Sequence, residues 1–212
     1  MIRHLSYFAT SLFLIPALAF AIDFTDRGTR YTDNNSLTVS ERAAVSVLTN
    51  AAVVSGYPDG SFGPDRPVNR AEFLKVALLS AGTDISVPTQ DCFPDVTHDQ
   101  WFASYVCEAK DRGIVQGNPD GLFHPARQVN YAEAVKILVT LHGYSLPLPP
   151  PNERWTWYRA YLLAAESHGV LLIGNIDPST VLTRGQTVRL AAAFLAQSEG
   201  QLDAYRAAEL GQ

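Results

Sequence analysis

The sequence predicts a mainly α-helical protein built from three helix–loop–helix units. The first observation is an internal repeat: residues 56–75 (GYPDGSFGPDRPVNRAEFLK) recur as residues 117–136 (GNPDGLFHPARQVNYAEAVK), 61 positions later, with 12 of 20 positions identical and no gap. The second is a stretch with apolar residues at helical spacing before each copy, and the third is a helix-start motif inside each copy. A unit of this length buries its apolar faces only against its neighbours, so we expect the units to pack into one body.

Residues 1–21 have the features of a signal peptide. A short basic start is followed by an apolar stretch at residues 5–20 and by the triplet Ala19-Phe20-Ala21, whose small outer residues suit signal peptidase. The alternative is a membrane anchor that is not cleaved, but the apolar stretch is short for a span and contains Pro16. We expect cleavage, no membrane span afterwards, and a mature chain that folds outside the cytoplasm.

The composition excludes several classes of protein. Hydrophobic residues make up 47% and charged residues 17%, as in globular rather than disordered proteins. The 16 Lys and Arg residues against 21 Asp and Glu give a net charge of −5, which argues against a nucleic-acid partner. Two cysteines exclude four-cysteine zinc sites and iron–sulfur clusters. We therefore predict neither a metal nor another cofactor.

The two cysteines, Cys92 and Cys107, are expected to form a structural disulfide. Export places them in a compartment that permits disulfides, and they lie 15 positions apart. The alternative, a redox or nucleophilic thiol, needs a partner motif such as two cysteines separated by two residues, which the sequence lacks.

The units follow one another with short connections. We place the first unit at residues 22–83, the second at 91–145 and a shortened third at 153–198, after a proline-rich linker at 146–152. The helical spacing that opens the units is carried by Ala44, Val45 and Leu48; by Phe102, Tyr105, Val106 and Ala109, ended by Gly113; and by Trp157, Tyr161, Leu162 and Ala165. The tail at 199–212 is amphipathic enough for a short helix that packs on the bundle or meets a partner.

The loops of the first two units carry tight turns, Pro58-Asp59-Gly60 and Pro119-Asp120-Gly121, which the third unit lacks. Proline presets φ and glycine tolerates positive φ, so this order suits a turn. Calcium binding is the alternative, but one carboxylate per loop falls short of the oxygen ligands that calcium needs. We predict no metal here.

The second helix of each unit starts with a capping box. An Asn or Thr accepts a hydrogen bond from a free backbone N–H, and a Glu or Gln three residues later reaches back. The predicted pairs are Asn69 with Glu72, Asn130 with Glu133, and Thr183 with Gln186.

Arg70 and Arg184 occupy the first helical position after these caps, where the helix dipole disfavours a cation. One interpretation is a solvated arginine or one paired with a nearby acid. The other is that a guanidinium beside free backbone N–H groups binds a carboxylate or phosphate. Tyr131 stands at this position in the second unit, which then lacks the anion contact or offers its ring for sugar stacking.

The turn in GYPDGSFGP and the helix starts VNRAE, VNYAE and LTRGQ resemble S-layer homology repeats, over about residues 24–198. The resemblance implies a pseudo-threefold bundle with three prongs and grooves between them. It also implies anchoring at the bacterial cell surface through secondary cell-wall polysaccharide, often acidic and pyruvylated. The family's arginine contacts the acidic sugar, a role that carries over to Arg70 and Arg184 only.

Departures from the repeat predict fewer than three working grooves. Tyr131 replaces the arginine, Gly185-Gln186 replaces Ala-Glu, and the third turn is shortened. The family's aromatic near the first helix is Trp101 or Trp157, whereas Ser40 stands there in the first unit. Either tryptophan could stack on a sugar, but a Trp at an apolar helical position is more often part of the core.

Two other classes of function compete with glycan binding. An enzyme such as a wall hydrolase is disfavoured because the repeats fill nearly all of the chain and the histidines form no metal or nucleophile motif: His98, His124, His142 and His168. A module that docks onto another envelope protein uses the same prongs. Retention on cell walls stripped of polysaccharide would favour that alternative.

Overall fold

The computed structural model describes residue 22 and residues 31–212, so the predicted signal peptide at 1–21 lies outside the described residues. The part described is mainly helical, as predicted, and its strand-like pairs are isolated β-bridges. A 3₁₀ turn, η1, at Asn34–Ser36 precedes seven α-helices: α1 Val39–Asn50, α2 Arg70–Ser80, α3 Ala103–Asp111, α4 Tyr131–Leu141, α5 Arg159–Ser167, α6 Arg184–Ser198 and α7 Leu202–Glu209.

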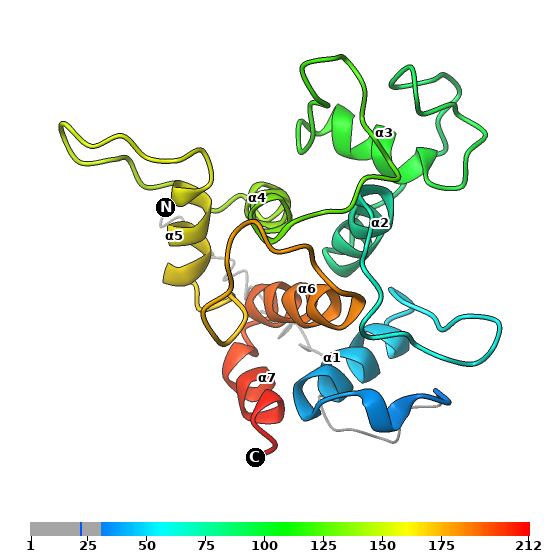
Figure 1. Ribbon diagram of the computed structural model, residues 1–212, viewed down its shortest axis with the longest axis vertical. Coiled ribbons are helices and arrows are strands. Elements are labelled where there is room, and N and C mark those ends of the chain that lie inside the picture. The colour runs from blue at the N-terminus through cyan, green and yellow to red at the C-terminus, as the bar shows by residue number, and fades with distance from the viewer. Residues whose placement is uncertain (1–21, 23–30) are drawn as a thin grey trace, which may run out of the picture.

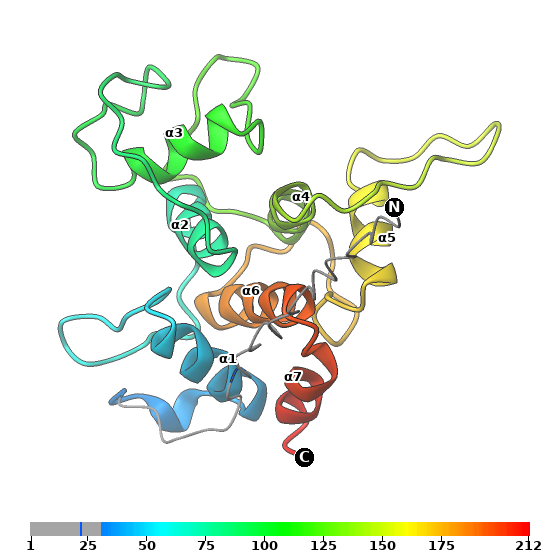
Figure 2. The same ribbon diagram turned by 180° about the vertical axis from the view of Figure 1, so that it is seen from behind.

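The second helix of each predicted unit lies at the centre. Figures 1 and 2 show α2, α4 and α6 in the middle, with α3, α5 and α1 outside them and long loops projecting outward. Helix α2 packs on α4 and α6, while α3, α5 and α1 pack on α2, α4 and α6 respectively. Helix α1 therefore closes the arrangement by packing on the last of the central helices.

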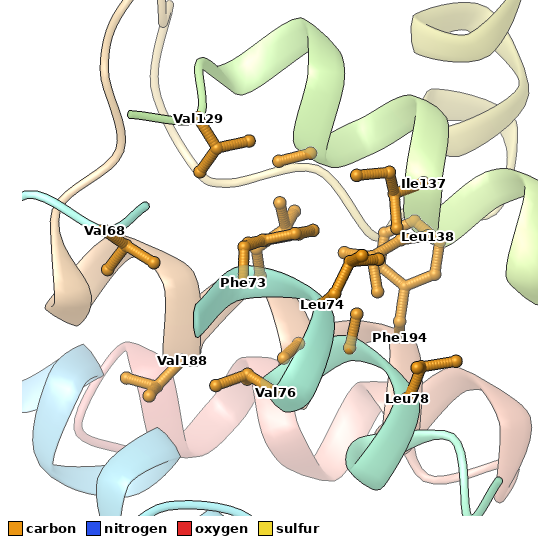
Figure 3. Close-up of a cluster of buried hydrophobic side chains, with 14 of the residues drawn as sticks. Val68, Phe73, Leu74, Val76, Leu78, Val129, Ile137, Leu138, Val188 and Phe194 are labelled. Carbon is orange, nitrogen blue, oxygen red and sulfur yellow. The ribbon is translucent and has the colours of Figure 1, made fainter. Parts of the chain in front are cut away.

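The core lies between the central helices (Figure 3). Phe73 and Leu74 of α2, Leu138 of α4, and Leu190 and Phe194 of α6 are all fully buried. Burial of each such large apolar side chain contributes about 1.5–3 kcal/mol to stability. Of the apolar positions predicted for the outer helices, Ala44, Val45, Leu48, Val106, Ala109 and Ala165 are buried, whereas Phe102, Tyr105, Tyr161 and Leu162 are only partly buried against the core.

A ring of three backbone hydrogen bonds joins the segments that enter the central helices. The N–H of Val68 donates to Leu182 O (3.0 Å), that of Leu182 to Val129 O (3.0 Å), and that of Val129 to Val68 O (3.1 Å). Each of these buried residues thus donates its backbone N–H to one neighbour and accepts the N–H of the other at its carbonyl. The ring fixes where α2, α4 and α6 begin.

The outer helices end in the same way. Ala52, Gly113 and Gly169 follow α1, α3 and α5, and all three have positive φ (57°, 71° and 69°). This left-handed residue is the usual end of a helix, and glycine adopts it without strain. Gly113 therefore ends its helix as the sequence predicts.

Cys92 and Cys107 form the predicted disulfide, with their Cα atoms 5.4 Å apart. The bond ties the loop that precedes α3 to the helix itself. Closing a loop of 15 residues contributes about 3 kcal/mol in the chain-entropy model.

The tail forms α7, which packs against α1 and α6. None of the helices in residues 31–212 combines the length and the apolar character that crossing a bilayer requires.

Candidate functional site

Capping boxes fix the starts of α2, α4 and α6. Asn69 Oδ1 accepts the Glu72 N–H at 2.9 Å, and Glu72 Oε2 accepts the Asn69 N–H at 3.0 Å. The same reciprocal bonds join Asn130 with Glu133 and Thr183 with Gln186. The caps therefore fix where each helix begins and where its first residue lies.

The first backbone N–H groups of these helices are not free. The Arg184 N–H donates to Arg66 O and the Gly185 N–H to Pro64 O, both at 2.8 Å. The starts of α2 and α4 make the same pair of bonds to residues 125–127 and 178–180. The expectation that free N–H groups receive an anion here is therefore wrong, because the neighbouring loop satisfies them. An anion at these helix starts would have to be bound by side chains rather than by the backbone N–H groups.

Arg184 lines a pocket of about 180 Å³. Its Nε donates to Phe62 O at 2.9 Å, and Nη2 donates to Ser55 O. Its guanidinium lies over the rings of Phe62 and Tyr57, with centroids at 4.6 and 5.1 Å. The two hydrogen bonds engage two of its five N–H donors, so this half-buried cation keeps capacity for an anion.

Lys75 and Trp101 form the opposite side of the same pocket. Lys75 Nζ lies 5.9 Å from the ring centroids of both Trp101 and Tyr105. Trp101 is 58% exposed and packs edge-on against Phe102. The interpretation of Trp101 as a core residue is therefore wrong. We call this pocket, lined by residues 53–57, Glu72, Lys75, Val76, Trp101 and Arg184, the first groove.

A second set of residues repeats this arrangement on α4 and α5. Lys136 Nζ lies 5.6 Å from the rings of both Trp157 and Tyr161, and Trp157 is 55% exposed, again outside the core. By analogy with the first groove, we use the name second groove for Arg70, Glu133, Lys136 and Trp157, which the contacts of Arg70 with Glu133 and of Lys136 with Trp157 bring together in pairs.

Arg70 in the second groove is only 8% exposed. Its Nε donates to Phe123 O at 3.1 Å, its guanidinium lies over the Phe123 ring, and Nη1 is 4.0 Å from Glu133 Oε1. Burial lowers the pKa of Arg70, with the nearby Arg127 adding to the effect. Arg127 also pairs with Glu133 at 2.5 Å. Arg70 and Arg184 thus bind equivalent carbonyls and rings, those of Phe123 and Phe62, and Arg70 differs in its deeper burial and in the Glu133 carboxylate beside it.

Tyr131 occupies the same helical position but is 4% exposed. Its hydroxyl accepts the Leu172 N–H at 3.3 Å, and burial raises the pKa of the phenol. The ring has no face open to a sugar, which corrects the interpretation that it offers a stacking surface.

Gly185 has a steric reason to replace the alanine of the other units. A Cβ at this position would lie 2.0 Å from Glu41 Oε1. Glu41 is held there because its Oε2 accepts hydrogen bonds from the backbone and hydroxyl of Thr38 at the start of α1. The start of α6 therefore accommodates a carboxylate of α1.

Some residues that shape the two grooves escaped the sequence interpretation. Lys75 and Lys136 are the last residues of the repeated segments, so their equivalence was visible in the repeat. Asp33 was not, because it lies outside the repeat. Its carboxylate accepts the N–H groups of Phe62 and Gly63, both at 2.8 Å, and so holds the loop whose carbonyl receives Arg184. Asp95 does the same for residues 123 and 124.

Two segments match the S-layer homology domain. They are residues 37–74 and 93–135, which carry the first two helix pairs up to the starts of α2 and α4. The S-layer homology match indicates a protein of the cell surface.

Curated relatives point in the same direction. The chain is 30% identical over 149 residues to the middle cell wall protein of Brevibacillus brevis, covering 69% of this chain and 14% of that protein. It is 35% identical over 116 residues to a surface layer protein of Brevibacillus choshinensis (53% and 10%). It is 29% identical over 103 residues to a cellulosome-anchoring protein of Acetivibrio thermocellus (45% and 22%).

The chain thus spans less than a quarter of the length of each of these three relatives. Their names are those of a cell wall protein, a surface layer protein and an anchoring protein, whereas a further relative, 26% identical over 165 residues, is named a cell wall amidase of Bacillus anthracis. In the described part of the chain, no three His, Cys, Asp or Glu side chains are grouped so that they could hold a metal ion.

Proposed function

We propose that the first groove binds an acidic cell-wall polysaccharide and so anchors the protein non-covalently to the bacterial cell envelope. The observation that carries the proposal is the convergence of Arg184, Lys75 and an exposed Trp101 on one pocket. The pocket also contains one acid, Glu72, whose carboxylate accepts the Asn69 N–H in the capping box of α2. The S-layer homology match and the cell-wall and anchoring relatives support it.

Each side chain has a chemical task in this proposal. The Arg184 guanidinium pairs with the carboxylate of an acidic sugar, such as a pyruvate acetal, by charge-assisted hydrogen bonds. Lys75 adds a second positive charge, and the exposed ring of Trp101 stacks on the apolar face of the sugar. The pocket is smaller than the roughly 300–1,000 Å³ of most ligand sites, which suits one part of a polymer that continues over the surface.

The proposal extends to the repeats. We assign units to residues 22–83, 91–145 and 153–198, joined by the linker 146–152 and related by a pseudo-threefold axis. The cyclic hydrogen bonds of Val68, Val129 and Leu182 support this assignment. The second groove binds more weakly in this scheme, because Arg70 is more deeply buried than Arg184 and lies beside the Glu133 carboxylate, while Lys136 and Trp157 remain accessible.

Co-sedimentation with isolated cell walls tests the proposal. The variants are Arg184→Met and Trp101→Ala, and the control is Arg112→Met, which removes an exposed arginine of the helix region that follows Trp101. We expect the wild-type protein and the control to sediment with native walls and to be released when the polysaccharide is removed. Each groove variant should need at least tenfold more wall material for half-maximal binding.

Two outcomes contradict the proposal. Wild-type binding by the combined Arg184→Met and Trp101→Ala protein would show that the first groove is not the site. Undiminished binding to walls stripped of polysaccharide would favour a protein partner in the envelope instead.

A further inference from the structure

Helix α7 lies across the position where the arrangement of the units leads us to expect a third groove. The first groove lies between α2, the α3 region and the loop at residues 52–56, which follows α1. The corresponding walls of a third groove would be α6, α1 and the loop at residues 169–173, which follows α5. Helix α7 packs on α6 and α1. A Cβ on Gly169 would lie 3.2 Å from Leu202, and one on Gly211 would lie 3.3 Å from Val39. Helix α7 thus spans the distance between the loop at residues 169–173 and α1.

Arg189 is the cation of this third groove. It stands five residues after the first residue of α6, as Lys75 does in α2 and Lys136 does in α4. The two lysines face the pairs Trp101–Tyr105 and Trp157–Tyr161. The corresponding positions of α1 are Ser40 and Ala44, so no aromatic pair faces Arg189 from that helix.

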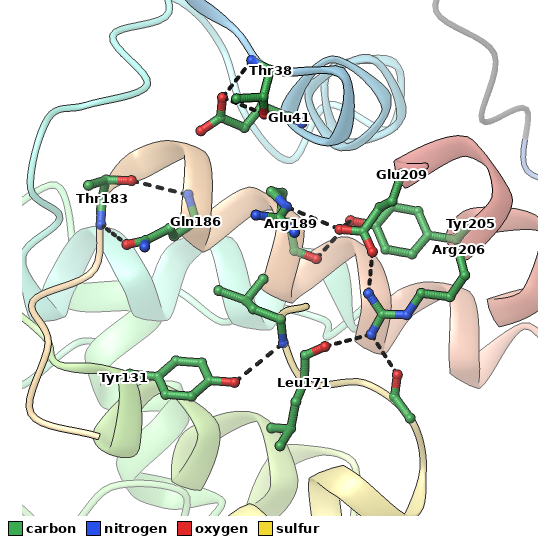
Figure 4. A network of polar contacts seen from close by, with 12 residues as sticks. Thr38, Glu41, Tyr131, Leu171, Thr183, Gln186, Arg189, Tyr205, Arg206 and Glu209 are labelled. Atoms are coloured by element: carbon green, nitrogen blue, oxygen red, sulfur yellow. Dashed lines mark hydrogen bonds and ion pairs between the residues drawn. The ribbon is translucent and has the colours of Figure 1, made fainter. Parts of the chain in front are cut away.

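A carboxylate of α7 takes the place opposite Arg189 instead (Figure 4). Glu209 Oε1 lies 3.1 Å from Arg189 Nε, and the Glu209 side chain is 0% exposed. Arg206 pairs with the other oxygen of the same carboxylate, and the Tyr205 hydroxyl donates to Arg189 O at 3.0 Å. A buried carboxylate is stable only when it is paired in this way.

Arg206 also contacts the loop wall. Its Nη2 donates to the carbonyls of Gly169 and Leu171, at 2.5 and 2.7 Å. In the first groove the corresponding loop receives Arg184 through Ser55 O. Helix α7 therefore brings both an arginine for the loop and a carboxylate for the central helix.

We propose that Arg189 belongs to a third site for an acidic sugar, and that Glu209 of α7 occupies this site as an internal carboxylate ligand. The inference rests on the proposed function of the first groove. An external carboxylate competes with Glu209 for Arg189, and its binding releases α7. A helix of eight residues is too short to be stable alone in water, so α7 unfolds when it leaves the groove.

The test uses the full chain and a synthetic monosaccharide glycoside carrying a pyruvate acetal, with the same glycoside lacking the acetal as a neutral control. The latch variant combines Arg206→Gln with Glu209→Gln. Both substitutions remove a charge; the one at residue 209 keeps the side-chain size, and the one at residue 206 shortens the side chain. Calorimetry counts the bound sugars, and hydrogen exchange reports whether α7 is docked.

We expect the latch variant to bind one more pyruvylated sugar per chain than the wild type, with amides of α7 exchanging at least tenfold faster. Adding Arg189→Met should remove the extra site. Saturating pyruvylated sugar should also accelerate exchange of α7 in the wild type, whereas the neutral sugar should not. Two results would overturn the inference: a released α7 without an Arg189-dependent site, or an α7 that stays protected in the latch variant.

Failure of this inference can be separated from failure of the proposed function. If the wild type binds the pyruvylated sugar and Arg184→Met weakens that binding, the first groove works whatever α7 does. If the wild type shows no Arg184-dependent binding, the proposed function itself fails.

Discussion

Replacing Gly185 by alanine copies the residue found at the same helical position in α2 and α4, Ala71 and Ala132. Alanine normally stabilises a helix by about 1 kcal/mol relative to glycine. Here its Cβ would lie 2.0 Å from Glu41 Oε1, so the Glu41 side chain has to leave its bonds to Thr38. Losing that cap costs about 0.5–2 kcal/mol.

Gly185→Ala alone is therefore expected to leave the free energy of unfolding nearly unchanged or lower. In a Glu41→Ala background the same substitution should stabilise by about 1 kcal/mol. The resulting coupling between the two sites is about 0.5–2 kcal/mol.

Urea unfolding of the four proteins, followed by circular dichroism, measures this coupling. Ala71→Gly is the control: it should destabilise by about 1 kcal/mol with or without Glu41. Additivity of Gly185→Ala and Glu41→Ala within about 0.5 kcal/mol would refute the steric explanation.

Three further predictions concern stability. Burial lowers the pKa of His142, so as the pH falls the unfolded chain binds a proton before the folded chain does. The contribution of His142 to stability should be complete above about pH 6.5 and decrease below it by at most about 1.4 kcal/mol per pH unit. His142→Gln should reduce this loss, which urea titrations at several pH values measure. Combined Cys92→Ser and Cys107→Ser should cost about 3 kcal/mol, seen as a lower melting temperature, and an unchanged melting temperature would mean that the disulfide does not constrain the fold. Tyr131→Phe removes the acceptor of the Leu172 N–H and should cost about 1 kcal/mol in urea unfolding without changing sugar affinity; a loss of affinity would show that Tyr131 contacts the ligand.

Much of the scaffold could be predicted because its signals are local. These signals are the repeated segment, the helical spacing of Ala44, Val45 and Leu48, and two cysteines 15 positions apart. In the structure the three apolar residues are buried and the two cysteines form a disulfide. The capping boxes are equally local, since a cap joins residues three positions apart.

The exposure of the tryptophans could not be predicted from helical spacing. Trp101 and Trp157 stand two residues before α3 and α5 begin, so the periodicity of those helices does not determine which way the rings face. Both rings lie outside the core, more than half exposed.

The different surroundings of Arg70 and Arg184 were also out of reach. Each donates its Nε to the carbonyl of the equivalent phenylalanine, Phe123 or Phe62, but Arg70 lies 4.0 Å from the Glu133 carboxylate, whereas Arg184 also donates to Ser55 O. The pairing of Glu209 with Arg189 likewise depends on how α7 returns to the bundle. Contacts between distant segments decide these positions, and a local motif does not encode them.

The indole resonances of the three tryptophans offer the most direct test of the first groove. Trp101 lines it, Trp157 belongs to the second groove, and Trp155 stands in neither. In a titration of the ¹⁵N-labelled protein with polysaccharide released from cell walls, we predict the largest shift at Trp101, no shift at Trp155, and loss of the Trp101 shift in Arg184→Met. Tight binding of the polysaccharide with an unmoved Trp101 resonance would contradict the account.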